Sequence, residues 1–325
     1  MLPSVTKLIL AIIFLLLFWV PPWITWGCLT QDKQTGMEVA PLTTTQKAAA
    51  PQDGSVGRIT GVIILAFARS GTHWMRLELE KHPCISIQPE VFGANWTSWT
   101  DETRLDGVKR FFDPFEKDGS LRSVAHLPGA RDWFEVSAKL VSQGKVVKGL
   151  NWKVEPEQGF VESWIPELRS FYLTHDVRIV WVRRLNDLRR IISSESIKWT
   201  GSAAVQSSQA ARQIAKVKPT VRPARYIHEL QKTEKLTQKI EEILQDAEQH
   251  GIQVFRTTYE HLQQSFGDIR RFLLHGSSCP LPASETQEKA GFLKLHSGKL
   301  RDLMGNFGEV EAELNKTKWA WMLTD

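Results

Sequence analysis

The segment from Ile64 to Trp74 has the pattern of an anion-binding loop. An apolar, β-branched run leads into small and hydroxyl residues, and a helix is expected to begin directly after them. At such a turn, backbone N–H groups and the helix dipole point at one place and can bind a phosphate or sulfate group. Gly71 lets the backbone approach the ligand, and Arg69 adds a charge-assisted hydrogen-bond donor. The residues that we predict to take part are Arg69, Ser70, Gly71, Thr72, His73 and Trp74.

This loop differs from the nucleoside-triphosphatase P-loop, whose pattern is GxxxxGK[ST]. It is shorter and lacks both the first glycine and the lysine of that pattern. A Mg²⁺-dependent ATPase is therefore disfavoured, and phosphoryl transfer from ATP stays open as an alternative interpretation. The loop serine does not lie in a GxSxG turn either, which argues against a hydrolase.

A second basic segment follows another apolar run, Val177–Val182. It extends from Arg183 to Ser193, and its first eight residues include four arginines. Taken alone, such a run is typical of the solvated start of a helix.

The elements that must position these two segments alternate between strands and helices. The near-continuous apolar run Ile59–Phe67 predicts a strand buried on both faces. Four further strands are expected at Cys84–Ile87, Val146–Val154, Val177–Val182 and Ile252–Thr258. One helix is expected from Thr72 to a point before Pro83, and a helical stripe of apolar residues predicts another at Tyr226–Gln249. This alternation indicates an α/β fold with a doubly wound parallel sheet.

The two segments resemble the cofactor-binding motifs of sulfotransferases that use 3′-phosphoadenosine 5′-phosphosulfate (PAPS). ARSGTHWMR after an apolar strand is similar to the loop that binds the 5′-phosphosulfate, with Arg69 where cytosolic members carry lysine and many carbohydrate sulfotransferases carry arginine. The second segment resembles the family's RNPxxxxxS motif, whose arginine and serine hold the 3′-phosphate. Ser193 matches that serine. Arg184 precedes it by nine positions and Arg183 by ten, against eight in the family, so either arginine could match.

The resemblance covers about residues 58–325 and includes three weaker stretches, His82–Phe92, Gly149–Lys153 and Arg256–Leu274. It implies a P-loop-like, three-layer fold with a central parallel sheet flanked by helices. It also implies transfer of a sulfuryl group from PAPS to a hydroxyl, most often of a carbohydrate, without a metal ion. Loops shape the acceptor cleft in such folds, and we expect those loops at 94–145 and 200–225.

The same resemblance suggests roles for individual side chains. Arg69 would stabilise charge on the bridging oxygen as it leaves. Glu90 matches the place where many carbohydrate-type members hold a catalytic glutamate, so it is the first candidate for the general base, with His126 the second. Lys153 is a candidate second cation, and Glu260 is interpreted as a structural residue at the end of the sheet.

The N-terminus predicts entry into the secretory pathway. Leu8–Trp26 is an uncharged stretch of 19 residues, just enough to cross a bilayer as a helix, and Lys7 places the preceding tip in the cytosol. We expect a signal-anchor at 1–27, a flexible stem at 28–57 and a catalytic domain at 58–325, as in a single-pass type II Golgi membrane protein. Because Pro21 and Pro22 divide the stretch, a cleaved signal peptide and secretion remain an alternative. Glycosylation sequons begin at Asn95 and Asn315.

Composition limits the remaining classes of function. The chain has 325 residues, 42% of them hydrophobic, and a net charge of +5 with both signs plentiful, which favours a local anionic ligand over nucleic acid. Three cysteines are too few for a disulfide scaffold, and the histidines and cysteines lack the spacing of a zinc site. We therefore predict no metal and no nucleic-acid partner. A non-catalytic lumenal nucleotide-binding protein is the second alternative to the enzyme.

Overall fold

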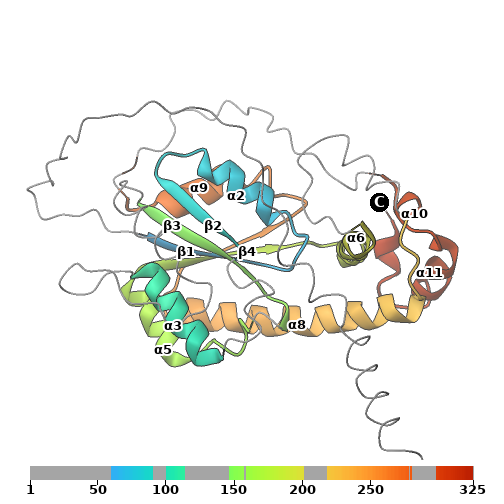
Figure 1. Ribbon diagram of the computed structural model, residues 1–325, viewed down its shortest axis with the longest axis horizontal. Coiled ribbons are helices and arrows are strands. Elements are labelled where there is room, and N and C mark those ends of the chain that lie inside the picture. The colour runs from blue at the N-terminus through green and yellow to red at the C-terminus, as the bar shows by residue number, and fades with distance from the viewer. Residues whose placement is uncertain are drawn as a thin grey trace, which may run out of the picture. The chain divides into compact units, whose positions relative to one another are not determined.

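A computed structural model of the chain describes residues 60–90, 100–113, 146–156, 159–200, 218–277, 279 and 298–324. Five parallel strands form one sheet in the order β2-β3-β1-β4-β5 (Figure 1). The strands are β1 (Thr60–Ala66), β2 (Ile85–Glu90), β3 (Val147–Lys153), β4 (Val177–Arg183) and β5 (Val254–Thr258). Each predicted strand forms, and the parallel α/β fold is confirmed. The anchor and stem expected at 1–57 lie outside the described residues.

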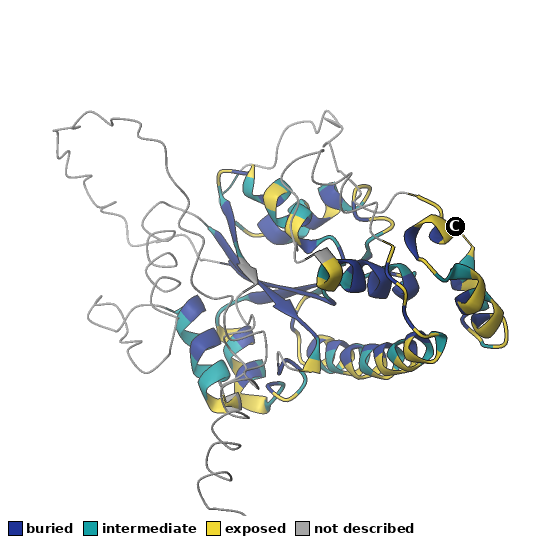
Figure 2. Cartoon of the chain, turned by 45° about the vertical axis from the view of Figure 1, so that its right-hand side comes forward, coloured by how far each residue is buried: buried dark blue, intermediate teal, exposed yellow. Residues whose placement is uncertain are grey.

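Helices cover both faces of the sheet, as a fully buried parallel sheet requires. Helices α2 (Thr72–Glu80) and α9 (Phe266–Leu274) pack on one face. Helices α3 (Asp101–Phe112), α5 (Pro166–Thr174) and the carboxyl half of α8 (Pro223–Gln249) pack on the other (Figure 1). All seven residues of β1 and of β3 are buried (Figure 2). β1 is accordingly a near-continuous apolar run, whereas β3 buries Lys148, Asn151 and Lys153 among its apolar residues.

A third hydrophobic cluster lies around the amino-terminal half of α8. It joins α8 to α6 (Asp187–Thr200), α10 (Leu300–Leu303), α11 (Phe307–Leu314) and the 3₁₀ turn η3 (Ala320–Leu323). Helix α8 has 27 residues and belongs to two clusters at once. The segment from Val177 to Thr200 also joins them, because β4 lies in the sheet and α6 lies in the third cluster.

The prediction that 94–145 is loop is wrong for part of that region. Helix α3 begins after Thr100, whose side chain accepts a hydrogen bond from the Thr103 N–H, and it buries Val108 and Phe111 against the sheet. Its apolar residues recur at helical spacing, so the signal was present in the sequence. In the second expected loop region, 200–225, α8 already begins at Pro223.

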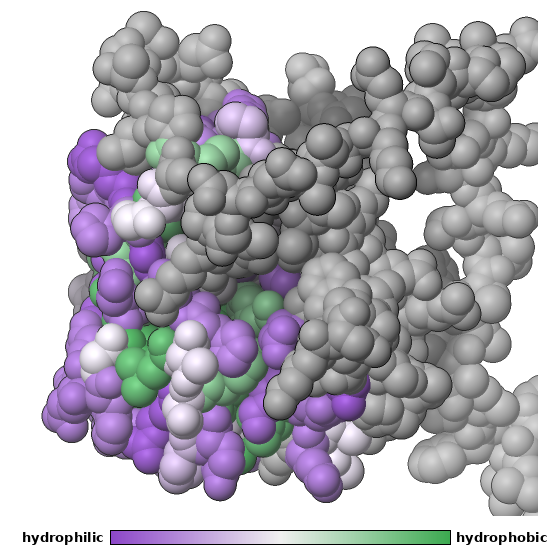
Figure 3. Space-filling model, turned by 90° about the vertical axis from the view of Figure 1, so that its left-hand side faces the viewer, coloured by the Kyte–Doolittle hydropathy of each residue, from purple (hydrophilic) through white to green (hydrophobic). Residues whose placement is uncertain are grey.

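A disulfide joins Cys84, just before β2, to Cys279, which follows α9. The two cysteines are 195 positions apart, so the bond closes a large part of the chain. On the surface shown in Figure 3, the described residues are mostly hydrophilic, and hydrophobic ones appear between them in small areas.

Candidate functional site

The loop between β1 and α2 has the backbone of an anion site. Arg69 and Gly71 both adopt left-handed conformations, with φ of 68° and 78°. Gly71 is the N-cap of α2, and no side chain there caps the first N–H groups of the helix. A β-carbon at Gly71 would lie 2.8 Å from the Tyr259 ring, so glycine is required for space as well as for conformation. The positive end of the α2 dipole therefore points to the loop, where an anion would be stabilised.

The hydroxyl groups of this loop differ in their partners. Ser70 is fully buried, and its Oγ has no hydrogen-bond partner within the part of the chain that the structure describes. Thr72 Oγ1 accepts a short hydrogen bond from Lys153 Nζ at the end of β3. A buried hydroxyl without a partner is costly, and a ligand oxygen would satisfy it.

The second basic segment contacts the first directly. Arg69 Nε donates to Ser193 Oγ on α6 at 3.0 Å, and Arg184 Nη1 donates to the Arg69 carbonyl oxygen at 3.3 Å. The Arg184 guanidinium also lies over the Tyr259 ring, 4.5 Å from its centroid. The structure thus brings together Arg69, Arg184 and Ser193, which the sequence analysis took from two distant segments.

Positive charge is concentrated at this contact. Burial lowers the pKa of the Arg184 guanidinium from its ordinary value, and the charges of Arg189 and Arg69 act in the same direction. Tyr259 and Glu260 oppose this effect. Cations held so close that they disfavour one another's charge are stabilised by a bound anion.

Arg183 lies in a different environment from Arg184. It lines a cavity of about 380 Å³ with carboxylates of α8, namely Glu234, Glu241 and Glu242. Of the two arginines that could match the family motif, Arg184 is therefore the one that contacts the loop.

A cavity of about 320 Å³ opens beside the loop, bounded by the ends of β1 and β3 and by α6 and α8. Lys153, Glu155 and Arg190 are among its lining residues. This is the carboxyl edge of the sheet, where Ala66 pairs with Lys153 on one side and with Val182 on the other. In open α/β sheets, ligands bind outside the carboxyl ends of the strands, at the point where the connections from two neighbouring strands run to opposite sides of the sheet.

Glu155 was missed by the sequence analysis. Its Oε1 accepts a hydrogen bond of 2.7 Å from the N–H of Ala68 in the loop, and its Oε2 is buried without a partner in the described residues. Burial raises the pKa of the Glu155 carboxyl, against the Ala68 N–H, Arg190 and Lys153, which all favour the charged form. The sequence carried one signal for it, a charged residue just after a buried strand, but that signal is common.

The other predicted residues are placed less directly. Glu90 ends β2 and pairs with Asn151, but its side chain is not among those described; His126 lies outside the described residues. His73 is exposed on α2, and Trp74 packs against Phe266, with ring centroids 5.7 Å apart.

Glu260 has the structural environment that the sequence analysis expected. Its carboxylate accepts hydrogen bonds from the N–H groups of Leu185 and Asn186, in the turn between β4 and α6. It therefore holds the turn that carries Arg184.

No protein-family model matches the chain, and no curated protein is significantly similar to it. Within the described ranges, none of the helices combines the length and hydrophobicity of a membrane span. The described histidines, cysteines and acidic residues do not gather in threes at any place where a metal ion could be held. The geometry of the loop, its arginines and the adjoining cavity is therefore what supports a function.

Proposed function

We propose that the protein is a sulfotransferase that moves a sulfuryl group from PAPS to a hydroxyl of a carbohydrate acceptor. The observation that carries this proposal is the direct contact between the two basic segments, through Arg69, Arg184 and Ser193. PAPS has phosphate groups at both ends of its ribose, and two anion-binding segments side by side suit such a ligand. We propose in addition that the three-layer fold is P-loop-like.

The residues present fit this co-substrate. The unpartnered Ser70 hydroxyl and the amino-terminal end of α2, with its positive dipole, would bind the 5′-phosphate, together with Thr72. Arg184 and Ser193 would hold the 3′-phosphate. The bound co-substrate supplies an activated sulfuryl group. Arg69 would stabilise the negative charge that develops on the bridging oxygen, as fixed cations do in phosphoryl transfer.

Two features agree with a lumenal location for the catalytic domain. Disulfides such as Cys84–Cys279 persist mainly in oxidising compartments. Asn315, the first residue of a sequon, is exposed at the end of α11, so a glycan could attach there. A type II Golgi protein anchored by 1–27 would combine both features, and secretion after signal cleavage would do so equally.

Thermal unfolding of the full-length protein in detergent tests the proposal. A ligand at ~100 times its Kd stabilises a protein by about 2.7 kcal/mol, which raises Tm by a few degrees for a domain of this size. We expect this shift with 3′,5′-bisphosphoadenosine and a much smaller one with Arg184→Ala. A shift only with ADP and Mg²⁺ would favour phosphoryl transfer, and no shift with either ligand would contradict nucleotide binding. Cofactor binding without transfer of ³⁵S from PAPS to any oligosaccharide would identify the non-catalytic alternative.

A further inference from the structure

Two helices form walls of the cavity beside the phosphate loop, and the residues that line it follow the same sequence spacing on both helices. Helix α6 contributes Ile191, Ser194, Glu195 and Lys198. Helix α8 contributes Glu229, Lys232, Thr233 and Leu236. Both sets follow the i, i+3, i+4, i+7 pattern of a single helix face, so the two helices present continuous faces to the cavity.

The chemistry of these walls suits a sugar. Each wall combines a carboxylate, an ammonium group and a hydroxyl. Glu195 on α6 is already paired with Lys198 at 2.7 Å and with Arg225 at 3.1 Å, and its second oxygen, like the α8 groups Glu229 and Lys232, can bind sugar hydroxyls. Each also contributes an aliphatic side chain, Ile191 or Leu236. Polar groups at the edges and carbon at the faces match a pyranose ring, and the volume of about 320 Å³ lies within the range of small-ligand sites.

Glu155 connects this cavity to the loop. It lines the cavity, while its Oε1 is bound by the Ala68 N–H at 2.7 Å, one residue before Arg69. A sulfuryl donor bound by the loop would therefore hold its sulfuryl group beside this carboxylate. The second oxygen, Oε2, is buried and has no partner in the described part of the chain, so an acceptor hydroxyl packed against it would satisfy its unmet hydrogen bond and could pass it a proton.

From this arrangement we infer that the cavity between the phosphate loop, α6 and α8 binds the acceptor sugar, and that Glu155 is the general base for its hydroxyl. This inference rests on the proposed function and replaces Glu90 as the base. The acceptor hydroxyl gives its proton to Glu155 Oε2 as its oxygen forms a bond to sulfur. The bond between sulfur and the bridging oxygen breaks, and its electron pair stays on the departing phosphate beside Arg69. Solvent then takes the proton from Glu155.

Lys153 and Arg190 would keep this carboxylate ionised next to an anionic donor. Both cations line the cavity and favour the charged form of Glu155. Arg190 is held within the protein by bonds to Asp187 at 3.0 Å and to Thr233 at 2.7 Å. A base whose pKa is raised toward neutrality by burial is better suited to accept a proton.

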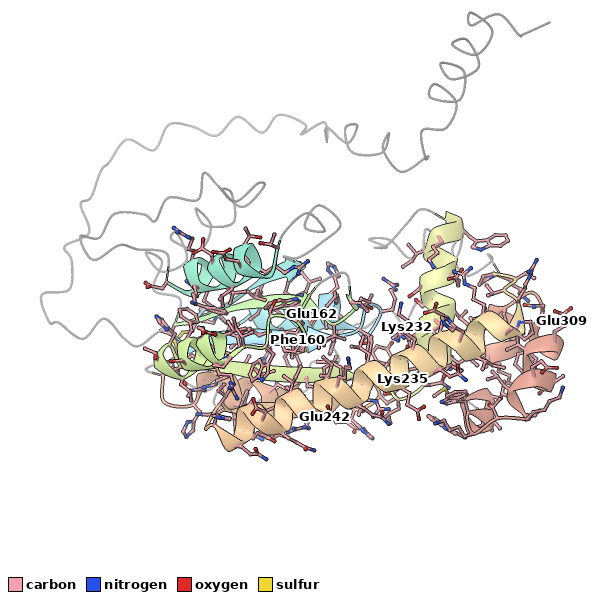
Figure 4. All side chains as sticks on the ribbon, turned by 90° about the horizontal axis from the view of Figure 1, so that it is seen from below. Phe160, Glu162, Lys232, Lys235, Glu242 and Glu309 are labelled. Carbon is pink, nitrogen blue, oxygen red and sulfur yellow. A yellow bond between two sulfur atoms is a disulfide. The ribbon has the colours of Figure 1, made fainter. Side chains whose placement is uncertain are left out.

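The test compares matched variants of the full-length protein. Transfer of ³⁵S from PAPS to a panel of neutral and acidic oligosaccharides gives kcat and acceptor KM, and thermal unfolding with 3′,5′-bisphosphoadenosine gives donor-site binding. Glu155→Gln keeps an oxygen for the Ala68 N–H but cannot take a proton at neutral pH. Its control is Glu162→Gln, an exposed glutamate outside the cavity (Figure 4). Lys232→Ala, on the cavity wall, is compared with Lys235→Ala, which is exposed on the same helix but does not line the cavity (Figure 4).

We expect Glu155→Gln to lower kcat by about 100-fold or more, to remove the acidic limb of the pH profile and to leave the bisphosphate shift unchanged. Lys232→Ala should raise the acceptor KM several-fold with little change in kcat, and both controls should behave as wild type. Wild-type kcat in Glu155→Gln, or loss of transfer in Glu90→Gln with an intact pH profile in Glu155→Gln, would overturn the inference and leave the proposed function standing. If the wild-type protein shows neither a bisphosphate shift nor transfer, the proposed function and this inference fail together.

Discussion

Arg69 and Ser193 are 124 positions apart in the chain, yet Arg69 Nε donates to Ser193 Oγ at 3.0 Å. Arg69 belongs to the loop after the central strand, and Ser193 lies on a helix of the third cluster. No local sequence pattern connects the two residues. Their contact makes the two basic segments one site.

The Arg69–Ser193 contact predicts energetic coupling in ligand binding. Arg69→Ala and Ser193→Ala should each weaken binding of 3′,5′-bisphosphoadenosine, because each removes a hydrogen-bond donor from the same site. Residues in direct contact typically show coupling energies of about 0.5–3 kcal/mol. Isothermal titration calorimetry on both single variants and the double variant measures this coupling, and strictly additive losses would contradict a shared site.

The two neighbouring arginines should differ sharply. Arg184→Ala should weaken bisphosphate binding by 10-fold or more, since hydrogen bonds between charged groups contribute about 1.5–3 kcal/mol. Arg183→Ala should have little effect, because Arg183 lines the cavity against α8 instead. Titrations of both variants at one salt concentration make the comparison. A larger loss of affinity in Arg183→Ala than in Arg184→Ala would mean that Arg183 holds the 3′-phosphate.

Lys148 should make stability depend on pH. It lies in β3, 1% exposed, with its Nζ 3.3 Å from the Phe112 carbonyl oxygen. Burial lowers its pKa to about 7, against the attraction of Asp113. Between about pH 7 and its ordinary pKa near 10.5, the unfolded chain therefore binds more protons, so the contribution of Lys148 to stability rises with pH across this window.

Urea unfolding at pH 7 and at pH 9.5 measures this dependence. Lys148→Met should be more stable than wild type at pH 7, and the difference should shrink at the higher pH. The exposed Lys239→Met serves as the control and should show no such trend. A difference that is independent of pH would mean that Lys148 is not neutralised on folding.

The Cys84–Cys279 disulfide should contribute measurably to stability. Native disulfides typically contribute about 2–4 kcal/mol, mainly by restricting the unfolded chain. Cys84→Ser, Cys279→Ser and the double variant should therefore share one lowered Tm, and reduction of the wild type should reproduce it. Cys28→Ser, which changes the remaining cysteine, is the control. Separate peptides for Cys84 and Cys279 in a non-reducing digest would contradict the pairing.

The strands could be predicted because their signal is local. β1 is buried along its whole length, and its near-continuous apolar run displays that burial in the sequence. β3 is equally buried although it carries two lysines and an asparagine, so its signal in the sequence is weaker. The loop could be predicted for the same reason, since Arg69, Gly71 and Thr72 lie within four positions of each other. Helix α3 has a local signal as well, because its apolar residues recur at helical spacing.

The rest of the site depends on contacts that no local pattern contains. The choice of Arg184 over Arg183 follows from which one faces the loop once α6 has packed. Glu155 becomes a candidate site residue only because the register of β3 beside β1 brings its carboxylate to the Ala68 N–H. Tyr259, whose ring lies beside Gly71 and under Arg184, had no distinguishing signal in the sequence.

Helix α8 has a mechanical consequence for the site. Its 27 residues form a rod of about 40 Å that has one end in the sheet's core and the other in the third cluster. Arg69 lies in the loop after β1 and Ser193 lies on α6 in the third cluster, and α8 packs in both the sheet's core and that cluster. The residues that would hold the ligand are therefore braced by one continuous helix, and we expect the site to have its shape before the ligand binds.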